Sequence, residues 1–247
     1  MQLTVIGCGD AFGSGGRLQS AYLVEVPGRT ILLECGASTQ IGLNKLDIDA
    51  NAIDTIVISH LHGDHFAGLV WMVLGAQFAT KRTQPLRVLG PPSIAARYAV
   101  AAEALFPGMT KVKRAFDIEF IEITERAPYA DPSLRVDAFE VVHPSDAPSY
   151  ALRLESGGVT LAFSGDTEWV DALVACSADA DLFIVECCSV DRAVKYHMNW
   201  RTVEKHLPEL SARKIMLTHM NADMLAYAAS VTSDRVLVAE DGLRIAL

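Results

Sequence analysis

The chain has 247 residues, of which 51% are hydrophobic and 21% are charged, so it can form a large core and is not intrinsically disordered. It has 21 Lys and Arg residues against 30 Asp and Glu residues. The net charge of −9 argues against binding long nucleic acid through a general positive field. The longest uncharged apolar stretch, 66–80, is shorter than the roughly 20 residues that span a membrane, which predicts a buried helix instead.

The first half of the chain begins with paired strands, and strands alternate with helices further on. Short apolar runs rich in β-branched residues predict twelve strands: 3–6, 22–26, 30–33, 55–58, 86–89, 118–123, 136–142, 150–154, 160–163, 182–185, 215–217 and 236–238. Helices are predicted between them: 38–46, 64–78, 92–106, 167–176, 200–210 and 222–230. The mixture favours an α/β fold in which helices cover sheets. We expect a single domain over 1–247, with the loop 125–134 as the boundary if the chain divides into two halves.

The cysteines favour a reducing compartment. The five residues are odd in number and show no Cys-x-x-Cys spacing: Cys8, Cys35, Cys176, Cys187 and Cys188. This pattern is typical of free thiols in the cytoplasm, not of a secreted disulfide framework. The N-terminal sequence also lacks the pattern of a signal peptide, so we expect a cytoplasmic protein.

The strongest chemical signal directly follows the predicted strand 55–58. Within six positions it has three imidazoles and a carboxylate: His60, His62, Asp64 and His65. Imidazole and carboxylate together suit zinc, manganese or iron. In an extended segment the first two His residues point to the same side, whereas Asp64 and His65 lie at the turn into the next helix and can face a second ion.

Three further strands are followed by a residue of the same kind. His143 follows strand 136–142, Asp166 follows strand 160–163, and His219 follows strand 215–217. Strand ends on one side of a sheet are where sites assemble in α/β proteins. The set supplies five His and two Asp residues, which is enough for two ions with an open position for water.

These segments resemble the motif series of the metallo-β-lactamase superfamily. They occur in the family's order: His60-Leu-His-Gly-Asp-His65, His143, Ser164-Gly-Asp-Thr167 and Leu217-Thr-His219. The resemblance implies a four-layer αββα sandwich with a dinuclear centre at one edge. It also implies that one ion is held by His60, His62 and His143. The other is then held by Asp64, His65 and His219, with Asp166 as the bridge.

Within that superfamily the chain is most similar to the ribonuclease Z and cyclic phosphodiesterase branch. The similarity rests on Asp181-Leu-Phe-Ile-Val-Glu186, followed by His197 and by Leu217-Thr-His219. It implies that Glu186 and His197 stand beside the metals and help to handle the phosphate. The chain has Met220-Asn221-Ala222-Asp223 where that branch has Ser-x-Arg-Tyr, and it has no long basic insertion between residues 89 and 166. Transfer RNA is therefore a doubtful substrate.

These observations predict a metal-dependent hydrolase in which a hydroxide bridging two metal ions attacks a small or cyclic phosphodiester or an RNA 3′ end. The expected cofactors are two Zn²⁺ ions, with Mn²⁺ or Fe²⁺ as alternatives. Asp64 is expected to bind metal and orient the hydroxide, and His197, supported by Glu186, to donate a proton to the leaving group. The expected partner is a small-molecule or short phosphodiester substrate. No contact with a membrane is expected. Related enzymes are often dimers, which favours a homodimer.

Three other functions fit parts of the pattern. The same centre could hydrolyse carboxylic esters, lactones or thioesters, since it polarises carbonyl groups. A di-iron redox enzyme usually carries a separate flavin domain, for which this chain has no room. A non-catalytic metal-binding scaffold has no physical need for an open coordination position.

A glycine-rich segment, 7–16, follows the first predicted strand. A dinucleotide-binding loop would be followed by a helix, but here a strand follows, so we expect a tight, mobile loop near the site. Arg17 is a candidate contact for an anion, and Asp10 is given no catalytic role.

Overall fold

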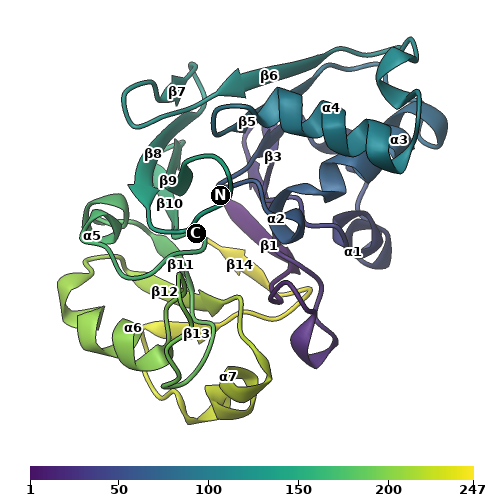
Figure 1. Cartoon of the computed structure of the whole chain (residues 1–247). Coiled ribbons are helices and arrows are strands. Elements are labelled where there is room, and N and C mark those ends of the chain that lie inside the picture. Colours follow the sequence, from purple (N-terminus) through teal and green to yellow (C-terminus); the bar gives the residue numbers. More distant parts are fainter.

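The computed structural model describes residues 1–247, which form two seven-stranded sheets (Figure 1). The first sheet has the order β14-β1-β2-β3-β4-β5-β6. Its strands are β1 (Gln2–Gly7), β2 (Ala21–Val26), β3 (Arg29–Leu33), β4 (Thr55–Val57), β5 (Leu86–Gly90), β6 (Ile118–Glu122) and β14 (Arg244–Ala246). The second sheet has the order β13-β12-β11-β10-β9-β8-β7. Its strands are β7 (Tyr129–Ala130), β8 (Arg135–Val141), β9 (Ser149–Ser156), β10 (Val159–Phe163), β11 (Leu182–Glu186), β12 (Lys214–Thr218) and β13 (Val236–Val238).

Seven α-helices and five short 3-10 turns connect these strands. The α-helices are α1 (Thr39–Lys45), α2 (Gly63–Phe66), α3 (Gly68–Phe78), α4 (Ile94–Leu105), α5 (Ala172–Cys176), α6 (Trp200–His206) and α7 (Ala222–Tyr227). The 3-10 turns are η1 (Ser14–Gly16), η2 (Ala50–Ala52), η3 (Met109–Lys111), η4 (Leu207–Glu209) and η5 (Ala228–Ser230). None of the helices is both long and apolar enough to cross a membrane.

Three hydrophobic clusters separate four layers. Successive side chains of a strand point to opposite faces, and β3 shows this directly. Ile31 and Leu33 belong to the cluster between the two sheets, together with Leu152 and Phe163 of the second sheet. Leu32 belongs to the cluster under α3 and α4. A third cluster lies between the second sheet and α5, α6 and α7 (Figure 1). The predicted αββα sandwich is confirmed.

All twelve predicted strands are present, but two short strands were not predicted. Tyr129–Ala130 forms β7 inside the predicted loop 125–134 and pairs with Val136 and Arg135 of β8. Arg244–Ala246 forms β14 and pairs antiparallel with the start of β1. Neither segment forms an apolar run rich in β-branched residues, which is why the sequence did not reveal them.

The predicted helix 64–78 is divided in two. It begins at Gly63, and α2 and α3 meet at Ala67. The N–H of Gly68 donates to the carbonyl of Cys35 at 2.9 Å instead of continuing the helix. A Cβ atom at Gly68 would lie 2.1 Å from the carbonyl oxygen of Gly36, so only glycine allows this contact.

The predicted helix 167–176 is wrong in its first five residues, because α5 begins only at Ala172. Residues 167 and 168 are held by long-range bonds instead. The N–H of Thr167 donates to Glu186, and the N–H of Glu168 donates to the carbonyl of Val142 at 3.3 Å. These bonds hold the segment after Asp166 against β11 and β8.

Candidate metal centre

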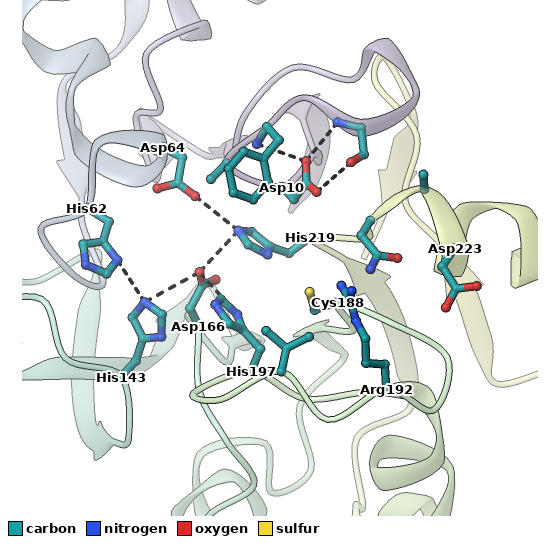
Figure 2. Close-up of a pocket in the computed structure, with 16 residues that line it drawn as sticks. Asp10, His62, Asp64, His143, Asp166, Cys188, Arg192, His197, His219 and Asp223 are labelled. Carbon is teal, nitrogen blue, oxygen red and sulfur yellow. Dashed lines mark hydrogen bonds and ion pairs between the residues drawn. The ribbon is translucent and has the colours of Figure 1, made fainter.

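Strand ends from both sheets meet at one edge of the sandwich. The predicted ligands lie in four short segments, which directly follow β4, β8, β10 and β12. The parallel pairing of β10, β11 and β12 places the segment of Asp166 next to Glu186 and His219. A bond from the N–H of Tyr150 to the carbonyl of Ser59 (3.1 Å) joins the end of β4 to the second sheet. Side chains distant in the sequence therefore face one pocket (Figure 2).

The first group of candidate ligands consists of His60, His62 and His143. One nitrogen of each ring lies within 4.8 Å of the others. The Nδ1 atom of His62 is 2.9 Å from the Nε2 atom of His143, so these two nitrogens face each other (Figure 2). His60 is fully buried, and its Nε2 atom has no hydrogen-bond partner.

The second group consists of Asp64, His65, Asp166 and His219. The Nε2 atom of His219 is 3.2 Å from a carboxylate oxygen of each aspartate. The Nε2 atom of His65 is 3.4 Å from Asp64 Oδ2 and 3.3 Å from Asp166 Oδ1. Asp166 Oδ2 also lies 4.0 Å from His143 Nε2, so this carboxylate stands between the two groups. All seven predicted ligands are thus brought together, five of them imidazoles.

The chemistry of these donors fits divalent cations. Buried polar atoms without a hydrogen-bond partner include His60 Nε2, His65 Nε2 and Asp166 Oδ1. Each such atom costs about 1–3 kcal/mol when it stays unpaired. Bound cations would pair with them, and imidazole with carboxylate is a set that zinc, manganese and iron accept.

The charges around the second group favour positive charge at its centre. Burial acts to lower the pKa of His219, but the carboxylates of Asp166 and Asp64 outweigh it and raise that pKa to about 9. The same carboxylates raise the pKa of His65 against the effect of burial. At His60 burial dominates and holds the pKa well below 6.5, so that imidazole is neutral. Metal ions bind neutral imidazoles and ionised carboxylates. A cation bound at the second group would therefore take the place of the protons on His65 and His219.

Glu34, which was not predicted as a site residue, holds two of the imidazoles in place. Glu34 follows β3, is fully buried and has a left-handed backbone with φ 64°. Its carboxylate accepts bonds from His65 Nδ1 (2.5 Å), Ser59 N (2.7 Å) and Ser59 Oγ (3.1 Å). Because the Ser59 hydroxyl donates to Glu34, it must accept the 3.0 Å bond from His60 Nδ1. The only signal in the sequence was an acidic residue directly after the apolar run 31–33.

These bonds fix the tautomers of three rings. His60 and His65 each carry their proton on Nδ1, which donates to Ser59 and Glu34. His143 Nδ1 donates to the carbonyl of Tyr196 at 3.0 Å. In the neutral form each ring therefore keeps the lone pair of Nε2 for the centre, as in metal sites whose ligands are oriented by outer hydrogen bonds.

Glu186 and His197 lie beside both groups. His197 Nδ1 is 3.0 Å from Glu186 Oε2 and 3.9 Å from Asp166 Oδ2. Burial and the neighbouring Asp166 raise the pKa of Glu186 to about 7. The bond to Glu186 raises the pKa of His197 against the effect of burial. The predicted pairing of these two side chains is present, with the ring of His197 half-buried at the pocket wall.

His197 belongs to a loop that closes on itself. Ser189 and Asn199 form a bridge at its base, and the N–H of Trp200 donates to Ser189 at 2.8 Å. Asn199 also caps α6 by accepting from Thr202 N at 2.9 Å. Four of the five residues 191–195 are exposed. Arg192, which was not predicted as a site residue, lines the pocket.

The glycine-rich loop lies at the pocket, but Arg17 does not point into it. The Arg17 guanidinium donates to the carbonyl of Ala239 and to Cys8 Sγ, so the expected anion contact is wrong. Asp10 lines the pocket, and its carboxylate accepts bonds from Phe12 N, Ser14 N and Ser14 Oγ. Its role in the structure is to shape the loop. All five cysteines are free and buried, as expected.

The chain is similar to several known proteins. The "Probable metallo-hydrolase YhfI" of Bacillus subtilis is 26% identical over 255 residues, and 98% of each chain is covered. Ribonuclease Z of Borrelia duttonii is 32% identical over 153 residues, which cover 60% of this chain and 46% of that enzyme. The crystal structure of human tRNase Z, short form, superposes with a TM-score of 0.80 at 24% identity, covering 100% of this chain and 99% of that one.

The relatives confirm the predicted metallo-β-lactamase fold and its ribonuclease Z-like branch. A family model covers nearly the whole chain: that of the anti-Pycsar protein Apyc1 matches residues 1–241. The chain therefore belongs to the Apyc1 family of anti-Pycsar proteins, among the metallo-hydrolases of the metallo-β-lactamase fold.

Proposed function

We propose that this Apyc1-family protein is a phosphodiesterase with two divalent metal ions, and that it cleaves a small or cyclic phosphodiester or an RNA 3′ end. The observation that carries the proposal is the His197–Glu186 pair, which lies against Asp166 and forms a further cluster with Asp166 and His219, outside the first ligand group. A pocket with two ligand groups and a separate proton donor has the parts that hydrolysis of a phosphodiester needs.

The proposed ligands of one ion are His60, His62 and His143, and those of the other are Asp64, His65 and His219, with Asp166 shared. Ions bound there supply Lewis-acid stabilisation of negative charge and make water a stronger nucleophile near neutral pH. We favour Zn²⁺, with Mn²⁺ or Fe²⁺ as alternatives, because the donors are nitrogen and oxygen.

The protein's own groups then handle the protons. Asp64 lines the pocket, and its Oδ2 atom faces His219 and His65, so its other oxygen is available to orient the attacking water. His197 donates a proton to the leaving oxygen, and Glu186 keeps the ring oriented and raises its pKa, which favours the protonated form that this step needs. A general acid of this kind contributes about 10²–10⁴-fold to the rate.

The relatives and the net charge both favour a small phosphodiester as substrate. Ribonuclease Z is the name of several relatives, which supports a phosphodiester over a carboxylic ester. The net charge of −9 weighs against a long RNA as substrate. A homodimer stays a prediction, which a measurement of the molar mass in solution by light scattering tests.

The test is a parallel assay of the protein loaded with Zn²⁺, Mn²⁺ or Fe²⁺. Substrates are bis-(4-nitrophenyl) phosphate, a 2′,3′-cyclic nucleotide, a precursor transfer RNA, a lactone panel and a thioester. We expect turnover of the first two, and metal analysis should give two equivalents per chain. Turnover of the lactones or the thioester alone would show that the protein is a carboxylic ester, lactone or thioester hydrolase and not a phosphodiesterase. Two bound metals without turnover of any substrate would favour the scaffold, and oxygen-dependent turnover with iron would favour redox chemistry.

The variant His62→Ala tests the ligands together with the activity. We expect it to lose bound metal and turnover in parallel, because one of only three imidazoles of the first group is removed. Full metal content with full turnover in this variant would contradict the proposed site.

A further inference from the structure

Phe12 is the most exposed of the large apolar side chains, although the chain has a large core in which to bury it. Its side chain is 92% exposed, against 55% for Phe78, the next most exposed phenylalanine. Phe12 also lines the same pocket as His62, Asp64 and His219. An aromatic side chain held in water at the mouth of a polar pocket has a ring face free for a ligand.

The loop that carries Phe12 is braced and is tied to the metal centre. The carboxylate of Asp10 accepts from Phe12 N at 3.2 Å and from Ser14 N at 2.9 Å. Gly9 at the base forms a bridge with Met220, and the N–H of His219 donates to the carbonyl of Cys8 at 3.1 Å. These bonds hold the backbone at Phe12 beside the candidate ligand His219.

The wall across the pocket offers hydrogen-bond donors. Figure 2 shows Arg192 on the far side of His219 from Asp10. Arg192 is exposed, and both hydrogen bonds of this residue are accepted by its backbone carbonyl, from Ser189 Oγ and Asn199 Nδ2. Its guanidinium is thus free to donate to a ligand, and the neighbouring Asn221 also lines the pocket.

We propose that Phe12 is a specificity-determining residue whose ring stacks on a flat aromatic group of the substrate, such as a nucleobase, while the phosphodiester lies at the metal centre. This inference rests on the proposed phosphodiesterase activity and names the part of the substrate that the glycine-rich loop recognises. Stacking accepts any base, because every base has a π-face. Arg192 then meets the oxygen atoms at the edge of the stacked ring or on its sugar.

The experiment compares two cyclic phosphodiesters that differ in the ring. One is 2′,3′-cyclic CMP and the other is glycerol 1,2-cyclic phosphate, which has no aromatic group. In Phe12→Ala we expect KM for the nucleotide to rise roughly 5- to 150-fold, as the loss of one base–aromatic stack implies. Its kcat, and both constants for the glycerol ester, should stay within about twofold of the wild type. Phe12→Trp should restore KM, because it keeps a stacking face.

Two controls distinguish stacking from a structural role of Phe12 and from a contact between subunits. Phe78→Ala removes an exposed phenylalanine at the end of α3 that does not line the pocket, and should change neither substrate's constants. Calorimetric titration with CMP gives a readout besides turnover. We expect Phe12→Ala to bind CMP more weakly than the wild type, and Phe78→Ala to bind it like the wild type. Equal losses for both substrates, or a changed mass of Phe12→Ala in light scattering, would overturn stacking in favour of a structural or subunit contact. Wild-type protein that cleaves neither of these esters, nor bis-(4-nitrophenyl) phosphate or precursor transfer RNA, with any metal refutes the proposed function itself.

Discussion

Three imidazoles of the candidate centre are each held by a bond at Nδ1, which leaves Nε2 of the neutral ring without a proton. Glu34 makes one of these bonds directly, to His65, and a second through Ser59 to His60. One buried carboxylate thus orients a ligand from each proposed ion site. Outer bonds of this kind set both the direction and the basicity of a metal-binding imidazole.

Glu34→Gln should weaken metal binding about 10- to 100-fold without removing a ligand. An amide offers one oxygen, so either Ser59 N–H or His65 Nδ1–H would face an NH₂ group. Competition with a chromophoric chelator measures the affinity. Glu25→Gln, at an exposed position of β2, is the matched control and should bind metal like the wild type. Unchanged affinity in Glu34→Gln would mean that the ligands need no such support.

His197→Ala should keep both metals and lose about 10²–10⁴-fold in kcat. The ring that we propose as the proton donor is removed, whereas the seven proposed ligands remain. His206→Ala is the control, because that ring stacks on Trp169 at 3.9 Å and does not line the pocket. Loss of metal from His197→Ala would make it a ligand, and unchanged kcat would remove its assigned role.

The candidate ligands could be predicted because their pattern is dense. Three His residues lie within six positions, and three further strands end in a residue of the same chemistry, a combination that a structural role alone does not require. Glu34, Phe12 and Arg192 could not be predicted in this way. Each is a single residue in an apolar run or a loop, and only the folded chain brings it to the pocket.

At the scale of elements, the order of the strands explains why the site forms where it does. Strands that were strongly apolar, such as β4 and β11, were predicted to within one or two residues. The failures, β7, β14 and the start of α5, are segments whose structure depends on partners distant in the sequence. Local preference says little about such segments, because tertiary contacts determine their conformation.

The short strand β7 leads to an ion pair that joins the two sheets. Arg29 at the start of β3 donates to Asp131 at 2.7 Å. Burial would raise the pKa of Asp131, but bonds from Tyr129, Ser133 and Arg29 outweigh it and lower the pKa below 3.8. A lowered carboxyl pKa adds stability above its ordinary value, and this stability disappears as the pH falls through the folded-state pKa.

Asp131→Asn should therefore lower the melting temperature at pH 7, and the difference from the wild type should shrink as the pH falls below about 4. We expect about 1–2 kcal/mol at neutral pH, or roughly 2–8 °C for a chain of this size. Circular dichroism melts between pH 2 and 7 measure it. Asp146→Asn is the control, because its side chain is 93% exposed and its pair with Arg97 contributes little. A difference that does not depend on pH would contradict the assigned ionisation.

At the scale of the whole molecule, the candidate centre takes its ligands from both sheets. Four come from the segment between β4 and α3, and three follow strands of the second sheet. The cluster between the sheets already holds them together, so metal adds to an existing core. An ion that binds only the folded chain stabilises it in proportion to the logarithm of its concentration.

Zinc at about one hundred times its Kd should stabilise the metal-free protein by about 2.7 kcal/mol, which is roughly 5–11 °C. Differential scanning calorimetry with EDTA and with added zinc measures the shift. His206→Ala should respond like the wild type, and His62→Ala should respond less. Equal melting temperatures with and without zinc would show that the ligands do not bind the ion in the folded state.

The self-closed loop between Ser189 and Asn199 has an evolutionary consequence. Its exposed stretch 191–195 can change in length or composition while the bridge at its base remains. Only the carbonyl of Tyr196 and the ring of His197 are tied to the centre. Descendants of one ancestral enzyme could thus acquire new preferences by altering five adjacent codons, with the reaction itself left intact.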